Sequence, residues 1–265
     1  MEEIIVSPSN PRIKNVVKLK EKSAERKIQD IIVVEGAREI RMAKQNGFEI
    51  KTLFVCDAVN QKRYKDIFLD IKHLVNVNKE VFSKIAYREN SDGMLALVKP
   101  KHIRLSDIKL SSNALVIVLE AVEKPGNLGA ILRTADGAGV DAVIVCDQKT
   151  DIHNPNIIRS SLGCVFSTQL VAASSPEVQK FLKEKNISIF AAALTGKQNY
   201  SEASFINSSA IVLGTESDGL SQSWLLAAQQ IKIPMLGKTD SLNVSTSCAV
   251  IVYEAVRQRG LKANG

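Results

Sequence analysis

Three short segments in the second half of the chain combine glycine, helix-capping residues and polar side chains that could act on a ligand. They occupy residues 127–133 (NLGAILR), 214–219 (GTESDG) and 241–245 (SLNVS). Each follows an apolar run, and the ends of strands in α/β sheets are where ligands usually bind. We therefore expect the three segments to form one shared site.

The first segment carries an amide and a cation. Asn127 precedes a helical stretch, and we predict that it is the N-cap of that helix, because asparagine is among the preferred residues there. Arg133 follows in an otherwise apolar helical pattern, where an arginine is seldom buried without a partner. Either a structural ion pair or a bound anion would satisfy it.

The other two segments also have structural explanations when taken singly. Gly214 and Gly219 let the backbone turn tightly and approach a ligand closely. Glu216 between them is either an exposed loop acid or a carboxylate that holds a cation. Asn243 and Ser245 either cap the last helix or bind a ligand.

A regular alternation of apolar runs and helical stretches surrounds these segments. It predicts a parallel sheet covered by helices on both faces, in an α/β fold. The expected strands are 114–119, 142–146, 168–171, 187–192, 210–213 and 231–234. The expected helices are 128–138, 155–162, 176–185, 222–229 and 244–259.

The first part of the chain has the pattern of a smaller α/β unit. Its expected strands are 31–35, 52–56, 73–77 and 94–98, with helices at 37–46, 60–70 and 79–86. Pro100 and the polar stretch up to residue 112 are typical of a linker. We therefore predict two domains, at 1–105 and 112–265.

All of the excess positive charge lies in the first part. Residues 1–110 contain 22 Lys and Arg against 15 Asp and Glu, whereas residues 111–265 contain 13 of each. Seven of the basic residues lie between positions 12 and 27. A solvated helical face is one explanation of this run. Concentration of the whole excess in one region favours the phosphate backbone of a nucleic acid as the partner.

Composition argues against a membrane protein and against a metal site. The chain of 265 residues is 45% hydrophobic and 24% charged, without an apolar stretch near the roughly 20 residues of a membrane span. The N-terminus lacks a secretory pattern, so we expect a cytoplasmic location. The four cysteines and three histidines have no metal-ligand spacing, and we expect reduced thiols and no metal.

Taken as a set, the segments NLGAILR, IVLGTESDGL and IPMLGKTDSLNVS resemble the SpoU-type (TrmH-like) family of SPOUT RNA 2′-O-ribose methyltransferases. They occur in the family's order across residues 114–259, and 154–163 is similar to the family's loop after the second strand. The N-terminal part resembles the family's small ribosomal-protein-like α/β RNA-binding domain. The resemblance implies a trefoil knot in the C-terminal domain. It also implies a homodimer through that domain, with Val250 and Tyr253 as candidate contacts.

The resemblance also implies a cofactor and roles for individual residues. S-adenosyl-L-methionine would bind at Leu194, Thr195, Gly196, Gly214, Ile233, Leu242 and Val244. The catalytic group would comprise Arg133, Asn127, Glu216, Asn243 and Ser245. A guanidinium stays protonated in proteins, so we expect Arg133 to bind a phosphate or the developing alkoxide, with Glu216 orienting it. The expected RNA-binding residues are Arg12, Lys14, Lys18, Lys20, Arg26, Lys27 and Arg159.

The resemblance favours 23S ribosomal RNA as the substrate, because the N-terminal domain is similar to those of enzymes that modify it. A transfer RNA ribose methyltransferase and a non-catalytic RNA-binding factor with the same fold are the alternatives. A nucleotide-dependent enzyme acting on a small molecule would leave the basic N-terminal part unexplained. The glycines around Asn127 also fail to match the dinucleotide-binding fingerprint.

Overall fold

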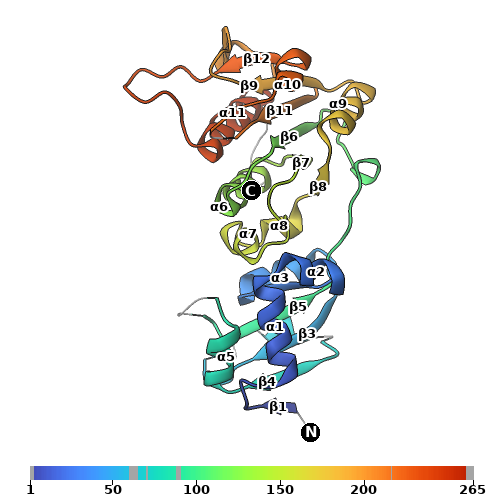
Figure 1. Cartoon of the computed structure of the whole chain (residues 1–265). Helices are drawn as coiled ribbons and strands as arrows, with labels where there is room; N and C mark the ends of the chain where they lie inside the picture. The colour runs from blue at the N-terminus through green and yellow to red at the C-terminus, as the bar shows by residue number, and fades with distance from the viewer. Residues whose placement is uncertain (1–2, 60–64, 70, 88–90, 216, 261–265) are drawn as a thin grey trace. The chain divides into compact units, whose positions relative to one another are not determined.

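The computed structural model describes residues 3–59, 65–69, 71–87, 91–215 and 217–260. The chain forms two compact units. The first comprises Met1–Lys101 and Asp151–Ser167, and the second comprises His102–Thr150 and Thr168–Gly265 (Figure 1). The division at Lys101 lies close to the expected linker. The assignment of 151–167 differs from the sequence-based division, which placed this segment in the C-terminal domain.

Contacts of Asp151–Ser167 explain why this segment belongs to the first unit. The Arg26 guanidinium forms an ion pair with the Asp151 carboxylate, with Nη2 and Oδ2 2.6 Å apart. The rings of Phe48 and Phe166 pack edge to face, with centroids 4.9 Å apart. The segment contains two short helices, α7 (Pro155–Ser160) and α8 (Cys164–Ser167). A hydrophobic pattern shows that such helices form, but it does not show which unit they pack against.

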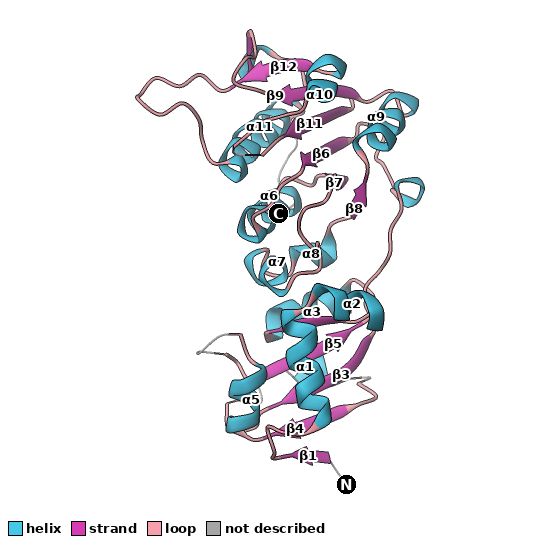
Figure 2. Ribbon diagram, in the orientation of Figure 1, coloured by secondary structure: helices cyan, strands magenta, loops and turns pink. Residues whose placement is uncertain are grey.

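The first unit is a mixed five-stranded sheet with helices (Figure 2). Its strands have the order β1-β4-β3-β5-β2, and β5 pairs antiparallel with both β2 and β3. The strands are β1 (Glu3–Ile5), β2 (Ile32–Glu35), β3 (Ile50–Val55), β4 (Leu74–Val77) and β5 (Met94–Val98). The helices are α1 (Pro11–Glu21), α2 (Ser23–Gln29), α3 (Ala37–Gln45), α4 (Lys65–Phe68) and α5 (Lys79–Ile85). Part of the helix expected at 60–70 falls outside the described residues.

The second unit is built on a parallel sheet, as the sequence predicted. Its seven strands have the order β10-β12-β9-β11-β6-β7-β8, and every neighbouring pair is parallel. The central strands are β6 (Leu115–Glu120), β7 (Ala142–Cys146), β9 (Ser188–Ala192) and β11 (Ser209–Leu213). The outer strands are β8 (Leu170–Ala173), β10 (Gln198–Asn199) and β12 (Gln229–Lys232). The two-residue β10 was not predicted.

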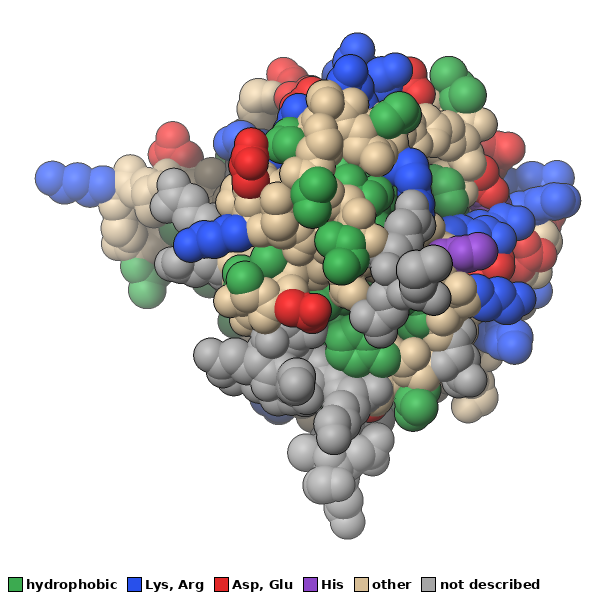
Figure 3. All heavy atoms as spheres, turned by 90° about the horizontal axis from the view of Figure 1, so that it is seen from below, with side chains coloured by type: hydrophobic (Ala, Val, Ile, Leu, Met, Phe, Trp, Pro, Cys, Tyr) green, Lys and Arg blue, Asp and Glu red, His purple; other side chains and the backbone are tan. Residues whose placement is uncertain are grey.

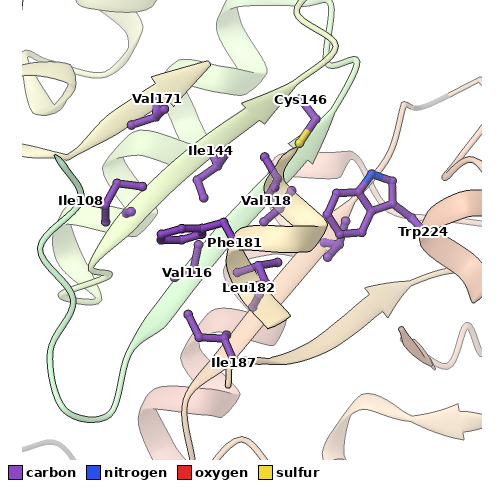
Figure 4. Close-up of a cluster of buried hydrophobic side chains, with 14 of the residues drawn as sticks. Ile108, Val116, Val118, Ile144, Cys146, Val171, Phe181, Leu182, Ile187 and Trp224 are labelled. Carbon is purple, nitrogen blue, oxygen red and sulfur yellow. The ribbon is translucent and has the colours of Figure 1, made fainter. Parts of the chain in front are cut away.

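Helices cover both faces of this sheet. On one face, α9 (Ser175–Glu184) and α10 (Gln222–Ala227) pack against side chains from β6, β7 and β11. The core there includes Val118, Ile144, Phe181 and Trp224 (Figure 4). On the other face lie α6 (Pro125–Gly137) and α11 (Val244–Gln258), which also pack against each other. A strand buried on both faces is apolar along its whole length, which is why these runs were recognisable in the sequence.

The cysteines lie within the cores. All four are buried free thiols. Burial raises the pKa of Cys146 to about 12, although a hydrogen bond with Ser175 opposes the rise. Burial alone raises the pKa of Cys248 to about 12. Both thiols therefore stay protonated near neutral pH and pack as small apolar groups. Among the described residues, no helix is long and apolar enough to cross a membrane.

Candidate active site

A pocket of about 360 Å³ lies in the second unit where the loops after β9, β11 and β12 meet. Of the residues expected to bind the cofactor, all except Gly196 line it. Apolar side chains such as Leu213, Leu220 and Ile231 make up much of the wall. Pockets for small molecules have this size, roughly 300–1,000 Å³, and this largely apolar lining. The structure thus brings the second and third sequence segments together.

Two glycines keep the backbone compact at this pocket. A Cβ at Gly214 would overlap the carbonyl group of Gly219, which accepts a hydrogen bond from the Thr215 amide at 3.0 Å. A Cβ at Gly196 would lie 2.7 Å from the carbonyl carbon of Ile231. Any larger residue would therefore force two backbone segments apart. Gly196 thus holds the segment of Leu194 and Thr195 close to β12, although it does not itself line the pocket.

A second, smaller pocket of about 220 Å³ adjoins the first. Both pockets are lined by Gly214, Thr215, Ser217 and Val244. The smaller one is completed by residues before and within the start of α6, which are Val122, Glu123, Lys124 and Asn127. The first sequence segment therefore reaches the same region as the other two. Two pocket residues were not among the predicted site residues: Lys124 lies just before the first segment, and Ser217 lies inside the second.

Asn127 is not the helix cap that the sequence predicted. Helix α6 begins two residues earlier, with Lys124 as the N-cap and Pro125 in its first turn. Proline fits the first helical position because its missing N–H would have no partner there. Asn127 is half-buried in the first turn, and its Oδ1 accepts a hydrogen bond from Asn243 Nδ2 at 3.2 Å. Its side chain thus joins the starts of α6 and α11.

The third segment does cap a helix. Asn243 is the N-cap of α11, and its Oδ1 accepts hydrogen bonds from the Ser245 amide at 2.9 Å and the Ser245 hydroxyl at 2.6 Å. Neither Asn243 nor Ser245 lines either pocket. Their polar atoms instead fix the start of α11, immediately beside the pocket residue Val244.

Arg133 lies outside both pockets. The buried residues of α6 include Leu128, Ile131, Leu132 and Ala135, whereas Arg133 is exposed. It therefore needs no buried ion pair, contrary to one explanation of the sequence pattern. Its guanidinium makes no hydrogen bond or ion pair within the part of the chain that the structure describes. Glu216, expected to orient it, lies outside the described residues.

Arg26 is not available for RNA. Only 5% of the residue is exposed, and besides Asp151 its guanidinium binds the carbonyl oxygen of Leu19 at 2.6 Å. Lys20 is half-buried, and its Nζ donates to the carbonyl oxygens of Lys84 and Ala86, each at 3.2 Å. Both residues stabilise the fold of the first unit. Burial of Arg26 argues against its prediction as an RNA ligand, whereas that of Lys20 stays a prediction. The charge pattern alone does not reveal which basic residues serve internal contacts.

The remaining predicted RNA ligands stay accessible. Lys14, Lys18, Lys27 and Arg159 are exposed, and Arg12 is half-exposed. Helix α1 buries Ile13, Val16 and Leu19, so Lys14 and Lys18 lie on its outer side, one turn apart. On the face shown in Figure 3, lysine and arginine side chains occur at several places among acidic ones. The described residues contain no His, Cys, Asp and Glu cluster suited to a metal ion.

Comparison with protein families gives matches to both units. Residues 114–253 match the SpoU rRNA methylase family, and residues 10–96 match the MRM3-like substrate binding domain. The chain belongs to the SpoU rRNA methylase family. The expected family and α/β class are thereby confirmed, and this SpoU family member is a methyltransferase. The trefoil knot stays a prediction of the resemblance.

Individual relatives align with nearly the whole chain. The 23S rRNA (guanosine(2553)-2′-O)-methyltransferase RlmP of Bacillus subtilis is 28% identical over 94% of this chain and 97% of its own length. A crystal structure of an RNA 2′-O ribose methyltransferase is 40% identical with a TM-score of 0.87, covering 97% of this chain and 100% of that one. The structure of an AdoMet-bound rRNA methyltransferase from Sinorhizobium meliloti matches with a TM-score of 0.88 and 25% sequence identity. The match covers 96% of this chain and 97% of that one.

Proposed function

We propose that this SpoU family member transfers a methyl group from S-adenosylmethionine to a ribose 2′-hydroxyl of 23S ribosomal RNA. The observation that carries the proposal is the convergence of all three sequence segments on two adjoining pockets. Two pockets that share a wall suit a reaction between two ligands, which must be held with their reacting atoms in contact.

The larger pocket fits the cofactor. Its apolar wall suits the flat adenine ring, and Gly214 and Gly196 let the backbone segments that form the pocket approach each other closely. Leu194, Thr195, Ile233, Leu242 and Val244 would hold S-adenosylmethionine there. When bound, the cofactor supplies an electrophilic methyl group on a positively charged sulfur.

The smaller pocket suits the acceptor ribose. Asn127 lies in its wall and can hydrogen-bond to the ribose. As the 2′-oxygen is deprotonated, negative charge develops on it, and positioned donors or cations lower the barrier. The guanidinium of Arg133 would neutralise that charge or a neighbouring phosphate, with Glu216 orienting it. Since Arg133 lines neither pocket, RNA or a second copy of the chain must bring its guanidinium and the acceptor together.

The first unit would hold the RNA. Its match to a substrate binding domain and the exposed Lys14, Lys18, Lys27 and Arg159 support this role. Phosphate contacts of this kind provide affinity rather than sequence selectivity. A homodimer through the second unit also belongs to the proposal. Tyr253 on α11 is 50% exposed and offers an apolar contact for it.

Transfer of labelled methyl groups tests this function. The protein is incubated with labelled S-adenosylmethionine and, separately, unmodified 23S ribosomal RNA and transfer RNA, followed by digestion to nucleosides. Label in a 2′-O-methylated nucleoside from 23S RNA supports the proposal. Label only in transfer RNA would show the alternative substrate, and cofactor binding without transfer would indicate a non-catalytic factor.

A further inference from the structure

A buried carboxylate lies at the end of β6, close to the loop that lines both pockets. Glu120 is the last residue of β6, and only 7% of it is exposed. Val116 and Val118 lie on the same face of the strand and pack in the apolar core with α9 and α10. A carboxylate is seldom buried in such surroundings without a partner. Apolar packing therefore does not explain why a glutamate occupies this position.

The partner of Glu120 is the backbone of a segment 101 positions away. Glu120 Oε2 accepts a hydrogen bond from the Ser221 amide at 2.8 Å. Ser221 is the N-cap of α10, and its own side chain makes no capping hydrogen bond. The carboxylate thus satisfies an N–H group at the start of α10, where the helix dipole also favours negative charge. One buried side chain thereby joins the end of β6 to the start of α10.

This hydrogen bond spans the place where two neighbouring strands send the chain in different directions. Strands β6 and β11 are parallel, and Leu119 and Leu213 are their last paired residues. After β6 the chain continues into α6 on one face of the sheet, whereas after β11 it continues into α10 on the other. Ligands of parallel α/β sheets bind where neighbouring connections diverge in this way. Glu120 therefore acts at the position in the sheet where a ligand site is expected.

The loop between β11 and Ser221 forms the wall that the two pockets share. Its residues line both pockets at the start of the loop and the larger pocket at its end. They are Gly214, Thr215 and Ser217, followed by Gly219 and Leu220. The Thr215 amide donates to the Gly219 carbonyl at 3.0 Å, and the Gly219 amide donates back at 3.2 Å. Because these bonds close the loop on itself, a shift of Ser221 would displace the wall as a unit.

We propose that Glu120 is a positioning residue that fixes the shared wall of the two pockets through the Ser221 amide. This inference rests on the proposed function for the identity of the two ligands. Glu120 lines neither pocket, so its effect on them is transmitted by the loop. A role confined to stabilising α10 would lower the thermal stability of the protein and leave the affinity for S-adenosylmethionine unchanged.

Glu120→Ala removes the acceptor of this hydrogen bond. We expect the calorimetric Kd for S-adenosylmethionine to rise by at least about tenfold. The kcat should fall by about 100-fold, the loss expected from a displacement of about 1 Å. Glu120→Gln keeps an oxygen that can accept from Ser221, so it should restore most of both quantities. Trp224 in α10 is the single tryptophan of the chain and is fully buried, so its fluorescence shows whether α10 is still packed.

Asp141→Ala is a matched control at the opposite end of β6. The Asp141 carboxylate accepts from the Leu115 amide at 2.8 Å and from the Ser111 amide at 2.6 Å. It therefore joins a loop to the first residue of β6, as Glu120 joins a loop to the last one. Asp141 lines neither pocket. Its substitution should lower the midpoint of thermal unfolding and leave both the Kd and kcat unchanged.

Ser221→Pro removes the donor in place of the acceptor. Ser221 has a φ of −63°, which proline also adopts, so the backbone angle at this position is kept. The proline ring replaces the N–H group that binds Glu120. The loss of cofactor affinity should therefore match that of Glu120→Ala. Since each substitution breaks the same hydrogen bond, the double variant should lose no more than either single one.

The outcomes separate this inference from the function on which it rests. Cofactor binding without methyl transfer to RNA by the unaltered protein would overturn the proposed function and leave the effect of Glu120 on the Kd intact. An unchanged Kd and kcat in folded Glu120→Ala, or multiplied losses in the double variant, would overturn the positioning role alone. Equal losses in Glu120→Gln and Glu120→Ala would also overturn it. If the Trp224 emission shows that Glu120→Ala is unfolded, Ser221→Pro decides, and normal cofactor affinity in that variant contradicts the role.

Discussion

The loops of the second unit and the basic segment of the first unit are both rich in polar residues, but folding affects them differently. In the second unit, segments more than 100 positions apart meet at adjoining pockets, and Asn127 and Asn243 are hydrogen-bonded. In the first unit, the seven basic residues between positions 12 and 27 have different environments. Arg26 and Lys20 bind internal partners, while Lys14, Lys18 and Lys27 remain exposed. The pocket residues could therefore be predicted from the order of the sequence segments. Which basic residues can reach RNA could not be predicted in this way, because that depends on which side chains are buried in the fold.

The largest effect on stability should come from the buried arginine of the first unit. Arg26→Ala leaves the Asp151 carboxylate without its ion-pair partner. The Asp151 side chain is only 12% exposed. Breaking a buried pair in this way costs about 3–5 kcal/mol. Urea unfolding measures the loss. Lys27→Ala is the neighbouring exposed control, and a similar loss in both variants would contradict the distinction.

The exposed arginine of the second unit should show the opposite behaviour. Under the proposed mechanism, Arg133→Ala lowers the single-turnover rate of methyl transfer by about 10²–10³-fold. Its free energy of unfolding should change by no more than about 0.5 kcal/mol, because the residue is exposed. An unchanged single-turnover rate would remove Arg133 from the mechanism.

Gly214 tests whether close backbone contact builds the pocket. Gly214→Val would push the Gly219 carbonyl away and displace the loop. Displacements of about 1 Å can reduce rates about 100-fold, and calorimetry should show a matching loss of cofactor affinity. Gly237→Ala serves as the control, since a Cβ there meets no atom within 4 Å among the described residues. Retained cofactor binding by Gly214→Val would mean that the cofactor binds elsewhere.

The accessible lysines should affect RNA binding alone. Replacing Lys14, Lys18 and Lys27 together by alanine should lower RNA affinity and reduce the slope of log K against log salt by up to about 2–3 units. Cofactor affinity should be unaffected. An unchanged salt dependence would place the RNA on another face of the first unit.

The smallest effect concerns the buried thiols of the second unit. Burial keeps them protonated and out of contact with solvent. With folded pKa values of about 12, Cys146 and Cys248 should resist alkylation at pH 8 until the protein unfolds. Their pKa values are raised by folding, so their contribution to stability is complete below about pH 8.5. It declines by about 1.4 kcal/mol per thiol for each pH unit above that. Rapid alkylation of the folded protein would show that these thiols are accessible.

Much of the fold could be predicted from the sequence because its strands are continuous apolar runs. Strands such as β7 and β11 are apolar at nearly every position and buried on both faces. The segment Asp151–Ser167 could not be assigned to its unit, since the Arg26–Asp151 pair joins residues 125 positions apart. The helix start at Pro125 was also missed, because asparagine and proline both mark such starts. Asn127 and Asn243 were both identified, but the hydrogen bond between them was not predicted, since no spacing rule connects residues on two helices.

Hydrogen exchange in the presence of S-adenosylmethionine tests most directly whether the separate loops form one cofactor site. The amides of 192–196, 213–220 and 231–244 are compared by mass spectrometry with and without the cofactor, using Gly214→Val as the control. We predict slower exchange in all three segments of the unaltered protein and in none of them in the variant. Protection confined to other parts of the chain would contradict the shared site.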